Sequence, residues 1–288
     1  MIIDAHAHLW KKQIGIVNGK PVYDIGGGRS NFGGEIKQMM PPYMTDGENT
    51  AERLLANMDY AGVSGAVITQ EYIDGNQDEY LLSCKSDRVK NCALFEEKEM
   101  GEISDFDGIK ICAGRLNDKN LLYHLEPFTL AENNGKFISI DLADGDEQTA
   151  EMQKIVEMFP KLRIAIGHFG MVTRENCLEQ IKLAKNENVF IESGGITWLF
   201  NSEFYPYPSA VKAINEAADL VGYEKLMWGS DYPRTMTAIT YKMSLDFIEK
   251  TTEISEENKR LILGENARKF YGFKDLPVPQ KVKNMVED

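Results

Sequence analysis

The chain contains 288 residues, of which 43% are hydrophobic and 27% are charged. These fractions are ordinary for a globular protein and argue against a disordered chain, while the length suits one (β/α)₈ barrel or two smaller domains. The net charge of −13 disfavours nucleic acid and anionic membrane surfaces, because like charges repel. We therefore expect a small-molecule substrate, and neither nucleic acid nor membrane as a partner.

Cysteine usage and the first residues indicate a cytoplasmic protein. The four cysteines form no C-x-x-C pair, which favours reduced thiols. The chain runs from Met1 directly into a predicted strand, without the basic and apolar regions of a signal peptide. No apolar run approaches the length of a membrane span.

Short β-rich apolar segments and helical patterns follow one another along the chain. Eight predicted strands cover residues 2–6, 66–70, 91–95, 108–112, 137–141, 163–168, 188–193 and 226–230. Helical patterns cover residues 50–61, 119–134, 147–158, 174–186 and 208–221. This alternation predicts a parallel sheet. Eight strands, no G-x-G-x-x-G after the first strand and polar residues at several strand ends favour a (β/α)₈ TIM barrel over a doubly wound sheet.

Two segments interrupt the alternation of strands and helices. Residues 10–49 are rich in Gly and Pro, and we predict a long loop there that acts as a lid over the catalytic face. Residues 275–288 form a polar tail with two prolines, which we expect to wrap the barrel or to contribute to a homo-oligomer contact. We see no domain boundary and expect a single domain over residues 1–288.

Chemically able side chains cluster at the predicted strand ends. His6 and His8 are two residues apart on strand 1 and therefore share one face, with Asp4 beneath them. His168 ends the sixth strand and Asp231 follows the eighth. Two imidazoles and a carboxylate at the mouth of a barrel are able to hold one metal ion, and Asp231 is also able to take a proton from water.

Each of these residues also has an ordinary structural interpretation. A histidine pair packs at many surfaces and in many cores, His168 could donate to a backbone carbonyl, and Asp231 could cap a helix or turn. All four coinciding at the matching ends of strands 1, 6 and 8 favours a functional site. The fourth histidine, His124, lies in a predicted helix beside leucines, and we assign it no role.

The sequence resembles the amidohydrolase superfamily, in particular its amidohydrolase-related branch of lactonases and non-oxidative decarboxylases. The resemblance spans nearly the whole chain in order. Its motifs are IIDAHAHLW at 2–10, AVITQEYIDGNQDEYLL at 66–82, FPKLRIAIGHFG at 159–170, LMWGSDYPR at 226–234 and LILGENARKFYG at 261–272. The first and fourth motifs together are the most specific.

This resemblance implies a (β/α)₈ barrel and, in metal-dependent members, one divalent ion, Zn or Mn. His6, His8 and Asp231 match the metal-binding pattern, and Asp231 also matches the general base. His168 matches the strand-6 histidine, which in such enzymes contacts the substrate or the hydrolytic water.

Strand 5 departs from the metal-dependent pattern. Those members usually have a histidine at its end, whereas this chain has Asp141. A carboxylate binds Zn²⁺ or Mn²⁺ through oxygen, so Asp141 is a candidate fourth ligand or a plain polar group. The lactonase branch includes members that lack this histidine and look metal-independent, and the Gln70-Glu71 ending of strand 2 resembles that branch.

Several cationic residues near the predicted mouth favour an anionic substrate. Lys110 lies on strand 4, Arg115 just beyond it, Arg234 after Asp231, and Arg29 on the predicted lid. Guanidinium groups match carboxylates in two-point hydrogen bonding, although each of these residues could also be a solvated charge or part of an internal ion pair. We assign the four cations and Gln70 to substrate binding.

The leading functional hypothesis is hydrolysis of a small, carboxylated cyclic ester or amide by activated water. A first alternative is non-oxidative decarboxylation of an unsaturated or aromatic acid in the same barrel, because a fold does not by itself decide chemistry. A second is an inactive binding barrel, which the missing strand-5 histidine leaves open.

Overall fold

The computed structural model of the chain describes residues 1–97, 100–280, 283 and 285. Eight parallel strands form one sheet in chain order, and all eight predicted strands are confirmed. They are β1 (Ile3–Ala7), β6 (Gly65–Ile68), β7 (Val89–Leu94), β8 (Gly108–Ile111), β9 (Phe137–Ile140), β10 (Arg163–Ile166), β11 (Val189–Glu192) and β12 (Leu226–Met227).

Main-chain hydrogen bonds between the first strand and the segment around the last strand close the barrel. The Ala5 amide donates to the Trp228 carbonyl at 2.9 Å, and the Asp231 amide donates to the His6 carbonyl at 2.9 Å. The predicted (β/α)₈ TIM barrel is therefore confirmed. This closure also brings the histidine motif of the first strand beside Asp231.

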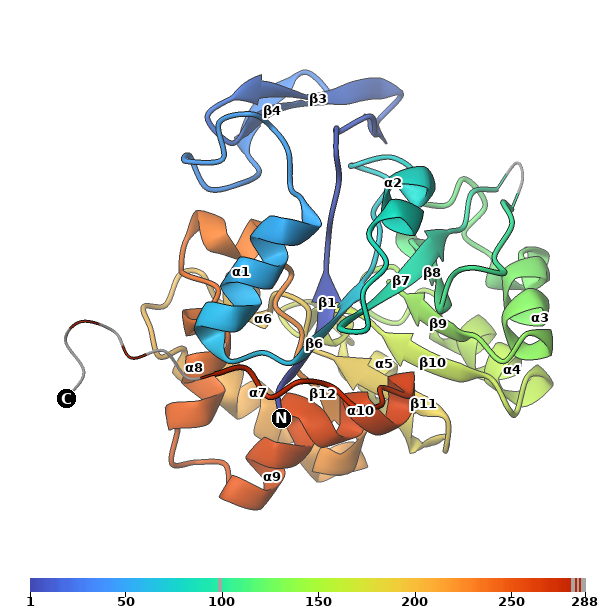
Figure 1. Cartoon of the computed structure of the whole chain (residues 1–288). Helices are drawn as coiled ribbons and strands as arrows, with labels where there is room; N and C mark the ends of the chain where they lie inside the picture. The colour runs from blue at the N-terminus through green and yellow to red at the C-terminus, as the bar shows by residue number, and fades with distance from the viewer. Residues whose placement is uncertain (98–99, 281–282, 284, 286–288) are drawn as a thin grey trace.

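Helices surround the barrel on its outer side (Figure 1). They are α1 (Ala51–Ala61), α2 (Asp78–Ser83), α3 (Leu125–Asn133), α4 (Thr149–Met158), α5 (Leu178–Lys182), α6 (Ile196–Leu199), α7 (Pro208–Val221), α8 (Met243–Lys250), α9 (Glu256–Arg260) and α10 (Asn266–Tyr271). The predicted helices at 50–61, 147–158 and 208–221 are confirmed with bounds that differ by at most two residues.

Two predicted helices are shorter than their sequence patterns. The pattern at 119–134 contains a 3₁₀ turn at Leu121–Tyr123, and α3 begins only after His124, whose φ of −119° and ψ of 48° are not helical. The pattern at 174–186 contains Asn176, which has a positive φ of 58°. A left-handed residue cannot lie inside a right-handed helix, so α5 begins after it.

The predicted loop at residues 10–49 is wrong in its secondary structure. This segment contains a four-stranded antiparallel sheet, which we call the accessory sheet, and which lies above the barrel mouth (Figure 1). Its strands are β2 (Ile16–Val17), β3 (Lys20–Gly26), β4 (Arg29–Phe32) and β5 (Glu35–Gln38).

The glycines that suggested a loop occupy the turns of β-hairpins. The pairs Asn18-Gly19, Gly27-Gly28 and Gly33-Gly34 join successive strands, and all six residues have φ between 50° and 103°. Two-residue hairpins need positive φ at both turn positions, which glycine and asparagine adopt at low cost. The glycine content therefore marks turns between strands, and the strands themselves are short and polar.

Apolar side chains fill the lower half of the barrel. One cluster of buried side chains belongs to the barrel strands and includes Ile3, Val67 and Phe137. Phe270 of α10 and Leu276 join the same cluster. The start of the predicted tail at 275–288 therefore packs against the barrel, whereas residues 281–282, 284 and 286–288 of that tail lie outside the described part of the chain.

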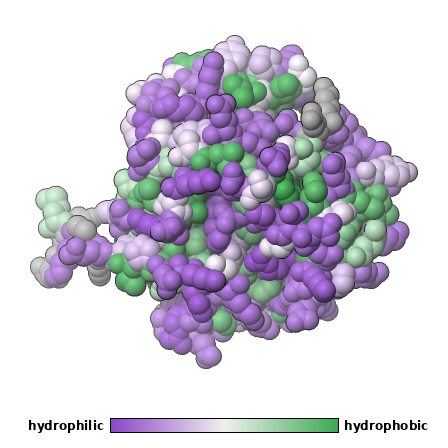
Figure 2. Space-filling model, turned by 45° about the vertical axis from the view of Figure 1, so that its right-hand side comes forward, coloured by the Kyte–Doolittle hydropathy of each residue, from purple (hydrophilic) through white to green (hydrophobic). Residues whose placement is uncertain are grey.

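The face of the molecule in Figure 2 is mainly hydrophilic, with apolar residues in groups between the hydrophilic ones. Among the described residues, no helix has the length and apolar character that a membrane span requires.

A buried carboxylate holds the closing strands together. Asp4 on β1 is fully buried and accepts four hydrogen bonds. Its Oδ1 accepts from the amides of His6 at 3.1 Å and Ser230 at 2.8 Å. Its Oδ2 accepts from the hydroxyls of Ser230 at 2.5 Å and Tyr241 at 2.8 Å. Asp4 thus positions the two segments that bear the site residues.

We predict that Tyr241→Phe lowers the free energy of unfolding by about 1–3 kcal/mol, because it removes one hydrogen bond to a buried charged group. Urea denaturation followed by circular dichroism measures this change. Tyr123→Phe is the matched control, since Tyr123 is 73% exposed. Equal unfolding free energies for the two variants would contradict this role of Tyr241.

Candidate active site

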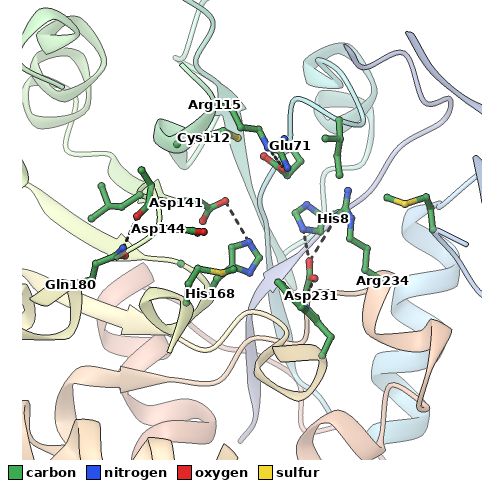
Figure 3. A pocket seen from close by; sticks show the side chains of 18 of the residues that line it. His8, Glu71, Cys112, Arg115, Asp141, Asp144, His168, Gln180, Asp231 and Arg234 are labelled. Atoms are coloured by element: carbon green, nitrogen blue, oxygen red, sulfur yellow. Dashed lines mark hydrogen bonds and ion pairs between the residues drawn. The ribbon is translucent and has the colours of Figure 1, made fainter. Parts of the chain in front are cut away.

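A cavity of about 950 Å³ lies at the C-terminal ends of the barrel strands. Side chains from many separate loops line it, as Figure 3 shows for His8, Glu71, Arg115, Asp141, His168 and Asp231. Residues 37–39 of the accessory sheet and the chain just after it also line the cavity. This is the face on which (β/α)₈ barrels place their chemistry.

Three predicted site residues meet on one side of this cavity. The Nε2 atoms of His6 and His8 lie 3.1 Å apart. Asp231 Oδ1 lies 2.8 Å from His8 Nε2 and 3.8 Å from His6 Nε2. All three side chains are at least 97% buried, so water does not screen them from one another.

The hydrogen-bond partners of the two imidazoles determine which nitrogen bears the hydrogen. His6 Nδ1 faces Glu192 Oε1 at 2.6 Å, and His8 Nδ1 faces the Thr69 carbonyl oxygen at 3.2 Å. Both partners are acceptors, so each Nδ1 donates. Burial first, and then the Arg234 guanidinium, lower the pKa of His8 well below its ordinary value, which favours a neutral ring.

Three lone pairs therefore converge on one point. An imidazole whose only hydrogen is on Nδ1 presents an unprotonated Nε2, and the Nε2 atoms of both rings face each other and the Asp231 carboxylate. Only a proton or a metal cation relieves this repulsion. The donor set and its spacing fit a divalent ion, because one ion accepts nitrogen and oxygen ligands together.

Asp231 is oriented by contacts on both of its oxygens. Trp198 Nε1 donates to Oδ2 at 2.8 Å, and Oδ1 faces His8. Burial acts to raise the pKa of this carboxyl, but His8 and the positive charges of Arg234 and His168 lower it below its ordinary value. The Asp231 backbone has a positive φ of 57°, a strained conformation for a residue with a Cβ that is typical of functional sites.

Lys110, Asp141 and His168 form a charged triad on the adjoining wall, where the His168 ring centroid lies 4.7 Å from that of His6. Lys110 is fully buried, with Nζ 2.6 Å from Asp141 Oδ2, and His168 Nε2 lies 3.5 Å from the same oxygen. Burial alone would lower the pKa of His168, but Asp141 outweighs it and raises this pKa to about 10. His168 is therefore a cation at neutral pH, and its Nδ1 donates to the Gly194 carbonyl at 2.8 Å.

Two of the predicted substrate-binding cations line the cavity, and each has a carboxylate partner. Arg115 Nε lies 3.1 Å from Glu71 Oε2. Arg234 donates through Nη2 to Asp74. These ion pairs hold both guanidinium groups at the cavity wall.

The other predicted binding residues lie away from the described cavity lining. Lys110 is enclosed behind Asp141. Gln70 is buried, and its amide donates to Asp78 at 2.5 Å and to the Cys92 carbonyl at 2.8 Å. Arg29 lies in an exposed position on β4 and donates to the Gly26 carbonyl at 3.1 Å. We infer structural roles for these three side chains.

Sequence reasoning missed Glu192, Glu71 and Asp74. Glu192 is the last residue of β11, is fully buried and holds the His6 ring. A charged residue that ends a buried strand on the catalytic face is a signal that the sequence contained. Glu71 and Asp74 follow β6, and only the folded barrel brings them to Arg115 and Arg234.

Among the described residues, three groups of side chains have ligand atoms close enough to hold a metal ion. Their members are His6, His8 and Asp231; His6, Asp141 and His168; and Glu71, Cys112 and Asp141. The first group is the most buried. In the other two, Asp141 already pairs with Lys110, which weakens its attraction for a further cation.

Solved structures with the same fold share little sequence identity with this chain. A zinc-containing amidohydrolase from Burkholderia multivorans is 14% identical, with a TM-score of 0.68, and the match covers 95% of this chain and 100% of that one. A probable 2-pyrone-4,6-dicarboxylic acid hydrolase from Acinetobacter baumannii, with citric acid bound, is 18% identical, with a TM-score of 0.69 and coverage of 94% and 99%.

A more distant neighbour is a 5-carboxyvanillate decarboxylase variant from Novosphingobium aromaticivorans that contains manganese and a nitrobenzoic acid. It is 16% identical, with a TM-score of 0.54 and coverage of 77% of this chain and 81% of that one. A sequence comparison with curated proteins gave no match. The model of the family described as Amidohydrolase matches residues 3–273, and the chain therefore belongs to this family of hydrolase-type enzymes.

Proposed function

We propose that this enzyme hydrolyses a small carboxylated lactone, or a related cyclic amide, at the cavity between Asp231 and His168. The observation on which the proposal rests is the convergence of His6 Nε2, His8 Nε2 and Asp231 Oδ1 within 3.8 Å. The adjoining cationic wall at His168 complements this arrangement. Hydrolysis needs a base for water and a positive group for the carbonyl oxygen, and the two walls supply them.

Asp231 acts as the general base in this proposal. Its carboxylate is ionised, and Trp198 fixes one oxygen so that the other faces the histidines. It takes a proton from water as the water attacks the ester carbonyl, and it returns the proton to the leaving oxygen. General-base catalysis of this kind contributes roughly 10²–10⁴-fold to the rate.

His168 stabilises the negative charge that develops on the carbonyl oxygen. A protonated imidazole donates a charge-assisted hydrogen bond, which strengthens as the oxygen becomes an oxyanion. Asp141, which is paired with Lys110, lies beside Nε2 of this ring. Because Nδ1 is bound to the Gly194 carbonyl, Nε2 is the nitrogen that would turn from Asp141, at 3.5 Å, toward the substrate.

His6, His8 and Asp231 would hold one Zn²⁺ or Mn²⁺ ion. Bound there, the ion would lower the pKa of a water molecule toward ~7 and polarise the carbonyl. Glu192 supports these ligands, because it orients His6 and increases the basicity of its Nε2. Asp141 Oδ1 is buried without a hydrogen-bond partner among the described residues and is a candidate further ligand.

The carboxylate of the substrate would lie against Arg234, with Arg115 and His168 as further positive charges around the cavity. Arg234 Nε and Nη1 are buried without a hydrogen-bond partner in the described part of the chain, so the guanidinium has unsatisfied donors beside the cavity. The pyrone dicarboxylic acid hydrolase with bound citric acid supports a ligand of this class.

We predict that the protein, purified after growth with added zinc or manganese, contains about one equivalent of metal per chain by elemental analysis. Glu192→Gln should weaken metal binding by about 10–100-fold, because the His6 ring loses its carboxylate partner. Glu187→Gln, an exposed position near the start of β11, is the control. A metal-free unaltered chain after supplementation would contradict metal dependence and favour water activation by Asp231 alone.

We also predict that Asp231→Asn reduces kcat on a hydrolysed lactone by about 10²–10⁴-fold while the fold remains intact. Ring opening releases acid, so a pH-indicator assay over a panel of carboxylated lactones and cyclic amides measures it. Asp219→Asn, at an exposed position of α7, is the control. Release of CO₂ from carboxylated acids without ring opening would favour a decarboxylase, and inactivity on every substrate would favour a binding barrel.

A further inference from the structure

Residues 10–49 contain the accessory sheet, and we call them the accessory segment. This segment contacts the proposed active site at Arg234. The Arg234 guanidinium lies over the ring of Trp10, 5.7 Å from its centroid. Trp10 is fully buried, and its Nε1 donates to the Gly47 carbonyl at 2.9 Å. Arg234 Nη1 is also 3.8 Å from Asp231 Oδ1. One guanidinium therefore touches both the segment above the barrel and the proposed catalytic base.

A chain of buried hydrogen bonds connects β4 to this guanidinium. Ser30 Oγ donates to Gln13 Oε1 at 2.5 Å, and Gln13 Nε2 donates to Asp74 Oδ1 at 3.0 Å. Asp74 Oδ2 accepts from Arg234 Nη2. Ser30, Gln13 and Asp74 are 0%, 1% and 2% exposed. A buried polar network whose members are hydrogen-bonded to one another holds its side chains in place.

The direction of each hydrogen bond in the chain is determined. A hydroxyl donating to Gln13 Oε1 leaves the amide nitrogen facing Asp74. A carboxylate only accepts, so Asp74 fixes which end of the Gln13 amide faces it, and the Ser30 hydroxyl holds the other end. Ser30 thus anchors Gln13, and Gln13 holds Asp74 in position.

Main-chain hydrogen bonds join the accessory segment to the loop that holds Asp74. The Ile14 amide donates to the Asp74 carbonyl at 2.9 Å, and the Ile16 amide donates to the Tyr72 carbonyl at 3.3 Å. Gln77 Nε2 donates to the Lys12 carbonyl at 2.8 Å. The loop after β6 and the accessory segment therefore form one block, and Asp74 lies where this block meets Arg234.

We propose that the accessory sheet positions the carboxylate-binding guanidinium of Arg234 through Ser30, Gln13 and Asp74, and so sets the affinity of the site for anionic substrates. The inference rests on the proposed function for the role of Arg234. It adds that Ser30, Gln13 and Asp74 are positioning residues, although none of the three is among the described residues that line the cavity. The accessory sheet then contributes to substrate specificity, in addition to covering the mouth of the barrel.

Citrate binding to the full chain, measured by isothermal titration calorimetry, tests this proposal independently of turnover. Arg234→Gln should raise the Kd of citrate by about tenfold or more, because charge-assisted hydrogen bonds are lost. Ser30→Ala and Gln13→Met, which change no charge, should each raise it by about three- to tenfold. Asn31→Ala is the control, because Asn31 is the next residue on β4 and its side chain bonds only within its own turn.

Two comparisons separate positioning from other effects. In an Arg234→Gln background, Ser30→Ala should cause no further change in Kd, whereas an unrelated structural effect would weaken binding equally in both backgrounds. Asp74→Asn should weaken citrate binding if Asp74 positions Arg234, and should strengthen it if Asp74 only neutralises the positive charge. Urea denaturation of each variant checks that the fold is retained.

Kd values for Ser30→Ala and Gln13→Met within twofold of that of the unaltered chain would overturn the proposal. Equal effects of Ser30→Ala in both backgrounds, tighter binding by Asp74→Asn, or no citrate binding by the unaltered chain would also overturn it. If Arg234→Gln loses citrate binding and the unaltered chain hydrolyses no lactone, the proposed reaction is refuted. The positioning of Arg234 by Ser30, Gln13 and Asp74 then remains supported.

Discussion

The closure of the barrel between β1 and the segment after β12 is the constraint on which the site depends. A main-chain hydrogen bond joins the Asp231 amide to the His6 carbonyl, and Asp4 binds both segments from below. Side chains alternate along a strand, so His6 and His8 share the inner face once this register is set. A slip of one residue in the register of β1 would turn both imidazole rings outward and separate them from Asp231.

Burial of charge determines the character of the two cavity walls. On one wall the Asp141 carboxylate lies between two cations, Lys110 and protonated His168. On the other, Arg234 lies between two carboxylates, Asp74 and Asp231. Isolated buried charges are costly, whereas compensated ones persist. The two arrangements have opposite polarity, so a substrate between them meets a positive group on one side and a base on the other.

The accessory sheet gives this barrel a feature that the strand and helix repeat does not require. Its three two-residue hairpins make a small sheet from a polar, glycine-rich segment, and its buried contacts lead to Arg234 through Gln13 and Asp74. A segment anchored by such contacts moves as a block rather than as a flexible loop. Ligand affinity and the position of the sheet are then linked properties.

Local patterns were sufficient to predict the barrel and part of its site. All eight strands follow from apolar runs, and His6, His8, His168 and Asp231 could be selected because the ends of parallel strands meet at one face. The accessory sheet was missed, because positive-φ turns and flexible loops have the same glycine-rich composition. Helix starts were missed where a single backbone angle, such as that of Asn176, decided them.

The partners of each charge were decided only by the tertiary structure. Glu192 and His6 are 186 residues apart, and Arg234 and Asp74 are 160 apart, so no local pattern relates them. The sequence alone could not distinguish the enclosed ion pair of Lys110 from the cavity-lining position of Arg234, because both are cations near a strand end. The sequence by itself determined that His6, His8, His168 and Asp231 lie at the ends of barrel strands. The tertiary structure decided which of them face the cavity and which face one another, because burial and pairing depend on contacts across the closed barrel.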